Sequence, residues 1–431
     1  MYNRFMSALK DELIRGVAHA AGLRARLGVS PATLMRSVRA AGLDVVRLGR
    51  ARATQYALRQ QWPHLDASRF PLFRITASGE PESAGELVTL AARQSAWMPA
   101  GRIANGLPIE MADARPAGFL GRHFAATHAD LRLPPRLVDW SDHHILAALS
   151  RRGADLPGNL VVGEESFSRW QSLAPDVAGR GDYPALADAT IAGHPPGSSA
   201  GGERPKFGVC VDGRHMLVKF AARRGAADVV AQRWADLLVL EGVALDVVAS
   251  WGVPAARTHV IGMPSHWFLE SARFDRVGAR GRLSVLSLAA VHDDPADTWA
   301  RAATRLWESG RLTGEDSRRL RWLDAFGALI ANTDRHHHNI VFFTDPGESL
   351  VRLAPAFDQV SMLYAPSADG QVSHRAFVVP RATPDTLDVW AAARDAAHQF
   401  WQRGADDRRV SDDMRATCAQ NARLVSQAGG N

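Results

Sequence analysis

An eight-residue polar segment, 332–339, constrains this 431-residue chain more than any other feature. It reads Asn-Thr-Asp-Arg-His-His-His-Asn, which places Asp334 and Asn339 five positions apart on a short loop, and a second aspartate, Asp358, follows an apolar stretch downstream. Magnesium prefers hard oxygen ligands of this kind. Phosphoryl transfer needs one Asp to accept a hydroxyl proton, and an Asn and a second Asp to hold magnesium on phosphates. The alternative is a solvated polar loop, because short motifs often match by chance.

Lysine is rare, which draws attention to the few lysines that remain. The chain has 51 Lys and Arg residues, but lysine occurs only at Lys10, Lys206 and Lys219. We therefore expect the remaining lysines at positions that need a compact ammonium rather than a planar guanidinium. Lys219 belongs to the apolar run 216–220, which predicts a buried strand. A lysine on such a strand needs an anion as its partner. Together with the downstream aspartates, this favours the phosphates of a nucleotide. The alternative is a charge at the end of the strand that reaches solvent.

A loop rich in glycine and serine, 193–206, precedes this strand. Glycines let backbone N–H groups approach a phosphate, and serine hydroxyls add donors, so Ser198, Ser199, Gly201 and Gly202 are candidate phosphate contacts. The alternative is a flexible linker between domains. No Gly-Lys dipeptide is present, which excludes a Walker-A loop, and no Gly-x-Gly-x-x-Gly opens a helix, which excludes a dinucleotide fingerprint.

With these residues in place, the chain resembles the HipA family of bacterial serine/threonine kinases, the toxins of HipBA-type toxin–antitoxin modules. Within that family it is most similar to the YjjJ-type members, which carry an added N-terminal DNA-binding segment. The resemblance runs from about residue 65 to the C-terminus and rests on these matching segments: 113–121, 155–160, 198–202 with Lys206, Lys219, 273–276, 332–339 and 357–361. It implies an α+β, bilobal, protein-kinase-like fold that uses ATP and Mg²⁺.

The resemblance also implies a role for each matching residue. Asp334 would be the catalytic base, Asn339 and Asp358 would hold magnesium, and Lys219 and Lys206 would contact ATP phosphates. The stretch 269–272, with Glu270 and Ser271, would supply the backbone that faces adenine. Ser198 stands where the family is autophosphorylated, with Ser199 as a rival, and a phosphate of about −1.5 to −2 charge there would disturb the bound nucleotide. An antitoxin is a further partner, and the substrate would be a protein, such as a translation factor or an aminoacyl-tRNA synthetase.

Two departures from the family pattern leave alternatives open. The glutamate expected near the start of the next helix is Gln232 here, so Asp236 or Glu241 would have to pair with Lys219, unless both are ordinary solvent-facing acids. Two extra residues, Arg204 and Pro205, stand before Lys206, which puts the role of that lysine in question.

The run of three histidines at 336–338 suggests a metal site, but adjacent imidazoles on one loop converge poorly on a tetrahedral zinc ion. The two cysteines, Cys210 and Cys418, are too few for a cysteine-rich zinc site. We therefore interpret the histidines as loop residues that orient Asp334, and assign His336 as its neighbour in catalysis.

The basic excess of the chain is confined to its N-terminus. Residues 1–60 contain eleven basic and three acidic residues, a net charge of +8, whereas the whole chain is +6. We expect helices over 13–22, 23–28 and 32–41, the last capped by Ser30 and Pro31, and then two strands around a basic tip within 45–56. This order predicts a winged helix-turn-helix that binds DNA. Its candidate contacts are Arg36, Arg39, Arg47, Arg50 and Arg52. A basic, solvated helical hairpin is the alternative.

Length and composition set the remaining expectations. A chain of 431 residues should divide into several units, and we expect a DNA-binding domain over 1–62, an α/β lobe over 63–275 and a mainly helical lobe over 276–431. The hydrophobic content of 46% is ample for folded cores. No apolar run reaches membrane-spanning length and no signal peptide is evident, so we expect a cytoplasmic protein without a membrane partner.

Overall fold

The computed structural model describes residues 2–116, 118–173, 177–192, 204–223, 228–367 and 369–428. The chain forms two compact units. The first comprises Met1–Thr76, Glu80–Pro116 and Phe124–Leu173, and the second comprises Ala77–Gly79, Ala117–His123 and Ala174–Asn431. The expected boundary at 62 falls inside the first unit, and that at 275 falls inside the second.

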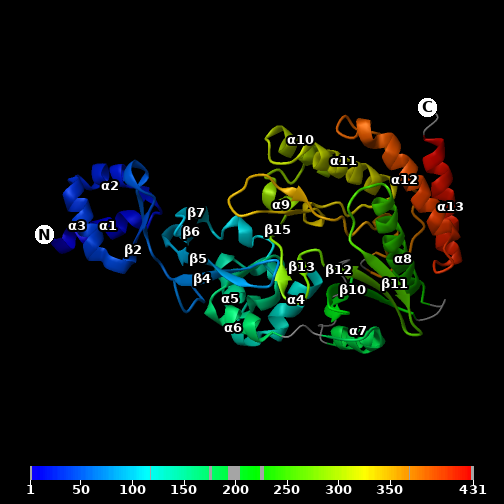
Figure 1. Cartoon of the computed structure of the whole chain (residues 1–431), viewed down its shortest axis with the longest axis horizontal. Coiled ribbons are helices and arrows are strands. Elements are labelled where there is room, and N and C mark those ends of the chain that lie inside the picture. The colour runs from blue at the N-terminus through cyan, green and yellow to red at the C-terminus, as the bar shows by residue number, and fades with distance from the viewer. Residues whose placement is uncertain are drawn as a thin grey trace. The chain divides into compact units, whose positions relative to one another are not determined.

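Three helices and a small antiparallel sheet form the N-terminal part of the first unit (Figure 1). The helices are α1 (Tyr2–Leu13), α2 (Ala20–Leu27) and α3 (Pro31–Ala41), and the strands β1 (Ala18–His19), β2 (Val45–Leu48) and β3 (Gln55–Leu58) lie in the order β1-β3-β2. Helix α3 begins as expected, because the Ser30 hydroxyl accepts from the Thr33 N–H at 3.2 Å. The prediction of a helix over 13–22 was wrong, since Gly16 has a φ of +126°, which no α-helix accommodates.

A five-stranded antiparallel sheet forms the rest of this unit. Its strands are β4 (Arg69–Ile75), β5 (Pro81–Thr89), β6 (Gln94–Met98), β7 (Arg102–Asn105) and β8 (Leu160–Val162), in the order β7-β6-β5-β4-β8. The helices that accompany it are α4 (Gly118–Thr127), α5 (Asp142–Arg152) and α6 (Glu164–Ser172). Leu72 and Leu87 of the sheet share one core with Ile145 and Leu149 of α5. A smaller core joins Val46 and Ala57 to the same sheet, so the N-terminal segment is continuous with it.

The second unit begins with a four-stranded antiparallel sheet. The elements are α7 (Tyr183–Ala192), β9 (Lys206–Val211), β10 (Arg214–Ala222), α8 (Val229–Ser250), β11 (Thr258–Gly262) and β12 (His266–Ala272), and the strand order is β11-β12-β10-β9. Successive side chains of a strand point to opposite faces. Val218 and Phe220 therefore share a core with Tyr183 of α7, whereas Ala221 packs against Leu238 of α8. Lys219 is two residues from Ala221, so its side chain lies on the same face of the sheet and points toward α8.

Short strands and five helices complete this unit. The strands are β13 (Arg276–Val277), β14 (Gly281–Arg282), β15 (Val285–Ser287), β16 (Val341–Phe343) and β17 (Arg352–Leu353). The helices are α9 (Leu288–Val291), α10 (Trp299–Glu308), α11 (Gly314–Leu329), α12 (Leu387–Asp406) and α13 (Asp412–Gln427). Helices α12 and α13 lie side by side, and α12 also packs on α8 (Figure 1). Among the described residues, no helix is both long and apolar enough to cross a membrane.

Candidate active site

Lys219 is a buried cation of the second unit, with only 6% of its surface exposed. It stands on β10 and points at α8, where its Nζ donates to the Glu241 Oε1 at 2.5 Å. Its Nζ also contacts the Asp358 carboxylate directly. Burial lowers the pKa of Lys219 to about 8, an effect that the charge of Glu241 opposes only in part. The ammonium is thus held between two carboxylates that come from distant parts of the sequence.

Glu241 is the acidic partner that the sequence left open. It is 2% exposed, and it also lies 3.5 Å from the Nη1 of Arg204, whose guanidinium stacks 5.2 Å from the ring centre of Trp234. Burial lowers the pKa of Arg204. One buried carboxylate therefore serves two buried cations. Because arginine is common in this chain, nothing in the sequence distinguished Arg204 from the other arginines.

Asp236, the other candidate, has a different role. Its carboxylate accepts from the Ser411 N–H at 2.9 Å and from the Ser411 hydroxyl at 2.6 Å, at the start of α13. Burial raises the pKa of Asp236, while these hydrogen bonds oppose the rise. Arg233, one turn earlier, pairs with Asp413 at 2.7 Å. Gln232 donates to Asp236 at 3.0 Å and so belongs to the same cluster. Helix α8 thus contacts the start of the last helix through Arg233 and Asp236, and contacts the lysine through Glu241, five residues after Asp236.

The loop that contains Asp334 is joined to Asp358 through Asn332. Asn332 is fully buried, its Oδ1 accepts from the Asp334 N–H at 2.9 Å, and its Nδ2 lies 3.5 Å from the Asp358 carbonyl oxygen. Ala331 and Asp358 both have left-handed backbone, with φ of 59° and 52°. Left-handed φ is uncommon outside glycine, more so for alanine than for aspartate. The backbone is therefore strained at Ala331, immediately before the loop.

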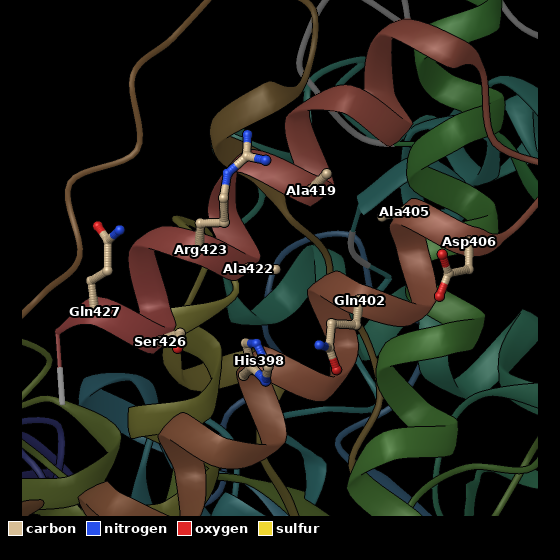
Figure 2. A pocket seen from close by; sticks show the side chains of 9 residues that line it. All are labelled: His398, Gln402, Ala405, Asp406, Ala419, Ala422, Arg423, Ser426 and Gln427. Atoms are coloured by element: carbon tan, nitrogen blue, oxygen red, sulfur yellow. The ribbon is translucent and has the colours of Figure 1, made fainter.

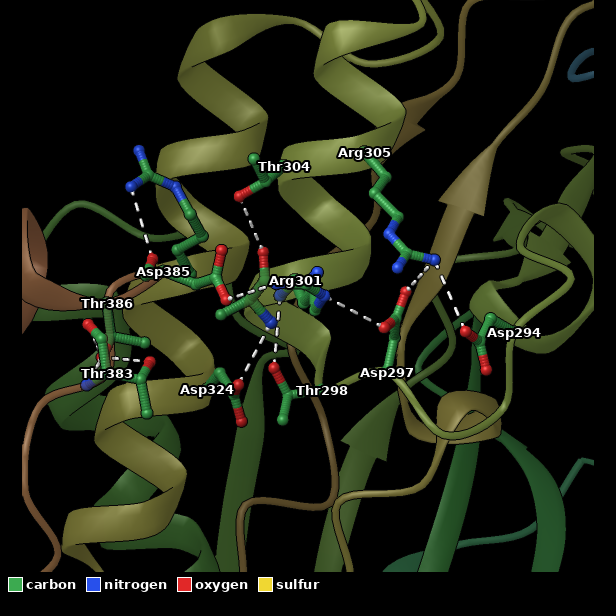
Figure 3. Close-up of polar contacts among 12 residues, drawn as sticks. Asp294, Asp297, Thr298, Arg301, Thr304, Arg305, Asp324, Thr383, Asp385 and Thr386 are labelled. Atoms are coloured by element: carbon green, nitrogen blue, oxygen red, sulfur yellow. Dashed lines mark hydrogen bonds and ion pairs between the residues drawn. The ribbon is translucent and has the colours of Figure 1, made fainter.

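Asp324 of α11 forms hydrogen bonds both with this loop and with the start of α10. Its Oδ1 accepts from the Arg335 Nε at 3.0 Å, and its Oδ2 accepts from the Ala300 N–H at 3.1 Å at the start of α10 (Figure 3). Arg335 also donates to the Asn332 carbonyl. The Trp299 indole N–H donates to the His336 carbonyl at 3.1 Å. These bonds fix the loop to two helices, and sequence reasoning had not singled out any of them.

A second set of contacts holds the same loop through α10. The His337 Nε2 lies 2.8 Å from the Asp297 carbonyl oxygen. The Asp297 carboxylate lies 2.9 Å from Arg305 and 3.4 Å from Arg301 (Figure 3). The His292 Nε2 lies 2.8 Å from Oδ2, the same carboxylate oxygen that Arg305 contacts. His337 is buried and used in this way, whereas His336 and His338 are exposed.

The two remaining residues of the predicted set lie on this supported loop. The Asn339 Nδ2 donates to the Asp334 carbonyl at 2.8 Å, which leaves the amide oxygen for another partner. The Asp334 side chain is about half exposed, and its Oδ1 lies 3.7 Å from the His336 Nε2. Lys219, Asp334, Asn339 and Asp358 therefore belong to one connected cluster. The donor set fits magnesium, since Asn339 and Asp358 offer an amide and a carboxylate oxygen.

The other predicted nucleotide contacts have different positions. Lys206 lies on β9 directly opposite Lys219, and its charge helps to lower the pKa of that lysine. Glu270 and Ser271 lie inside β12 and pair with strands on both sides. The Glu270 carboxylate accepts from the Arg180 Nε at 2.7 Å and from the Tyr183 hydroxyl at 2.5 Å. Ser198, Ser199, Gly201 and Gly202 lie outside the described residues.

The five predicted DNA contacts are all exposed in the N-terminal part of the chain. Arg36 and Arg39 lie on α3, Arg47 lies on β2, and Arg50 and Arg52 lie between β2 and β3. The acids Glu12 and Asp44 pair with other basic residues: Glu12 with Arg15 and Arg26, and Asp44 with Lys10 and Arg59.

A separate open hollow of about 530 Å³ lies between α12 and α13. It is lined by His398 and Gln402 of α12 and by Arg423 and Gln427 of α13 (Figure 2). None of the residues that surround Lys219 or Asp334 lines it.

Comparison with known proteins identifies the family. The model of the YjjJ-like toxin, middle domain, matches residues 66–171, and that of the HipA-like C-terminal domain matches residues 198–426. Over 446 residues the chain is 34% identical to Toxin YjjJ of Escherichia coli (strain K12), and the match covers 98% of each protein. The chain belongs to the YjjJ-type toxins of the HipA family.

A solved structure places this YjjJ-type toxin in the HipA-like fold. A chain of the Shewanella oneidensis MR-1 complex of HipA, HipB and operator DNA matches with a TM-score of 0.53 and 13% identity, over 82% of this chain and 95% of that one. The proinflammatory kinase CtkA of Helicobacter pylori matches 52% of this chain and 90% of its own at 12% identity, but its TM-score of 0.36 is too low to support an argument. The α+β, HipA-like fold expected from the motifs is therefore confirmed.

Proposed function

We propose that this YjjJ-type toxin is a serine/threonine protein kinase that transfers the γ-phosphate of ATP to a protein hydroxyl. The observation that carries the proposal is the direct contact of Lys219 with Asp358, while Asn332 joins the Asp358 backbone to that of Asp334. A strand lysine, a metal-binding Asp and a loop Asp in one cluster form the set that phosphoryl transfer uses. Few other chemistries need all three together.

Each group has a defined task in the proposed reaction. Lys219 holds the phosphates of ATP, and Arg204, at the other carboxylate oxygen of Glu241, adds positive charge nearby. Asp334 accepts the proton of the attacking hydroxyl, because it is exposed to an incoming chain and its backbone is fixed by Asn332. Asn339 and Asp358 would hold Mg²⁺, which would neutralise charge on the phosphates. Lys219 and Asp358 are counter-ions for each other in this structure, and a magnesium–nucleotide complex would offer each a new partner.

Autophosphorylation with γ-labelled ATP tests this proposal. Wild-type protein should incorporate label, whereas Asp334→Ala should incorporate none and still bind nucleotide, because Lys219 and Asp358 are unchanged. Ser198→Ala tests the position of the label, since we propose Ser198 as the acceptor and Ser199 as the residue to examine next. Nucleotide binding by wild-type protein without any transfer would refute the kinase. That outcome would leave a nucleotide-sensing regulator, the alternative function.

We further propose that residues 1–62 bind DNA. The support is the net charge of +8 over residues 1–60, with Arg36 and Arg39 exposed on α3 and Arg47 exposed on β2. Binding of this kind weakens steeply with salt because counterions are released from the phosphates. Affinity for duplex DNA should fall by orders of magnitude between low and physiological salt. Replacing the five exposed arginines by alanine should abolish binding, and unchanged affinity in that variant would refute this part of the proposal. An antitoxin that binds the same toxin is a compatible partner.

A further inference from the structure

Three histidine side chains lie close together in the first unit. In sequence they are distant from the residues of the candidate active site. His64 lies on the turn between β3 and β4, and His143 and His144 lie in the first turn of α5. The ring of His64 stacks on that of His143 with centres 5.4 Å apart, and lies 4.9 Å from that of His144. One nitrogen from each ring lies within 4.8 Å of the other two. Two separate segments therefore present three imidazoles to one point.

The backbone on both sides of this cluster is held by a shared core. Trp62 and Leu65 flank His64, and Trp140 and Ile145 flank the other pair. All four side chains are less than 10% exposed and belong to the same hydrophobic cluster. The backbone that carries the three imidazoles is thus held by packing, which contributes to the preorganisation that a ligand site needs.

Contacts with Ser141, the N-cap residue of α5, account for part of the cluster. The Ser141 N–H donates to the His144 Nδ1 at 3.2 Å in a capping box, and the Ser141 hydroxyl lies 2.9 Å from the His143 Nδ1. These contacts do not involve His64, which is exposed and holds a left-handed φ of 62°. His64 nevertheless stacks on His143 with only 10° between the ring planes. Capping therefore does not explain why His64 joins the other two rings.

We propose that His64, His143 and His144 form a binding site for a divalent transition-metal ion of the zinc type. Imidazole nitrogens suit Zn²⁺, Cu²⁺ and Ni²⁺. Three histidines from two elements can fill three positions of a tetrahedral ion and leave the fourth open to water. The histidines at 336–338 are adjacent on one loop and converge poorly on such an ion. The ion would clamp the β3–β4 turn to the start of α5 and so stabilise the first unit. This site is independent of the kinase chemistry.

Metal titration of the full-length protein tests the site. After removal of metal with a chelator, Zn²⁺ is titrated in competition with a chromophoric chelator, and Co²⁺ is added separately to record its visible ligand-field bands. Wild-type protein should bind one Zn²⁺ at the cluster and gain thermal stability from it. His64→Ala should weaken binding at least tenfold, since loss even of an outer-shell partner costs about 10–100-fold. His143→Ala should do the same.

Two variants separate the site from capping and from the other histidines. His144→Gln keeps an acceptor for the Ser141 N–H and removes the imidazole, so it should lose metal without loss of the helix. His338→Ala removes an exposed imidazole of the 336–338 run and should bind as wild type does. The proposal is overturned if wild-type protein binds neither Zn²⁺ nor Co²⁺, if any of the three cluster variants binds as wild type, or if His338→Ala weakens binding as much as His64→Ala.

Discussion

Replacement of Glu241 by glutamine should destabilise the second unit strongly, because it leaves two buried cations without their shared carboxylate. Glu241 is 2% exposed and accepts from Lys219 at 2.5 Å, with Arg204 at 3.5 Å. Removing one partner of a buried ion pair costs about 3–5 kcal/mol. Asp358 still contacts Lys219 in the variant, which offsets part of that cost. We therefore expect the free energy of unfolding to fall by about 3 kcal/mol.

The pKa of Lys219 shows that this site disfavours the charged ammonium even with Glu241 present. The pKa is lowered from 10.5 to about 8, so holding the ammonium charged at this site already costs about 3 kcal/mol. Glu241 is the largest influence that opposes the shift. Its loss lowers the pKa of Lys219 further, and the lysine then gives up its proton closer to neutral pH.

A double-mutant cycle measured by urea unfolding at pH 7 tests the argument. Glu241→Gln, Lys219→Met and the double variant are compared, and the two substitutions should be coupled by about 1–3 kcal/mol, because the neutral pair leaves no unpaired ammonium. Asp246→Asn is the matched control, since Asp246 is an exposed acid on the same helix and its loss should change stability by less than about 0.5 kcal/mol. A Glu241→Gln variant as stable as the control, or strictly additive effects, would refute the reasoning.

Four further predictions concern the site and the N-terminal segment. Affinity for ATP should fall as pH rises through about 8, the pKa of Lys219, because the lysine then loses its charge. Lys219→Arg should remove this pH dependence because a guanidinium stays charged. Fluorescence titration of both proteins with ATP across that pH range measures the two affinities. The same lysine keeps its proton to higher pH when unfolded, so its unfavourable contribution to stability should diminish from about pH 8 to about pH 10.5. Asp324→Asn should lower kcat by about a hundredfold with KM for ATP nearly unchanged, because Arg335 then holds the loop of Asp334 less firmly. Steady-state kinetics measure both constants, and a change in KM alone would contradict the prediction. Arg47→Ala should reduce the salt slope of DNA binding by about one unit without changing sequence preference, as filter binding at several salt concentrations would show.

The chemistry of the site was easier to predict from sequence than its support. Lys219 and Asp334 were recognisable because each is an unusual residue in its setting, a lone lysine on an apolar strand and an aspartate beside three histidines. The choice between Asp236 and Glu241 was not predictable, because α8 is buried on almost all sides and has no polar face to set its rotation. Only the packing of α8 on the sheet directs Glu241 to the lysine.

Other parts of the structure depend on contacts between distant segments. Asp324 and Arg335 are ordinary charged residues in sequence, and their meeting beneath the loop requires α11 to be in place. The cluster of His64 with His143 joins a turn to a helix through a shared core, so no local pattern reveals it. The first helix was misplaced for a local reason, since Gly16 breaks a stretch whose apolar pattern otherwise favours a helix.

The position of Asp236 and Glu241 on one helix has a mechanical consequence for the lysine. Asp236 is bonded to Ser411 at the start of α13, and Glu241 stands on the same continuous helix, about 7–8 Å further along its axis. A rigid helix transmits a tilt along its length. We therefore expect that a protein that binds α13 and displaces it also shifts the carboxylate that pairs with Lys219, without contacting the lysine itself.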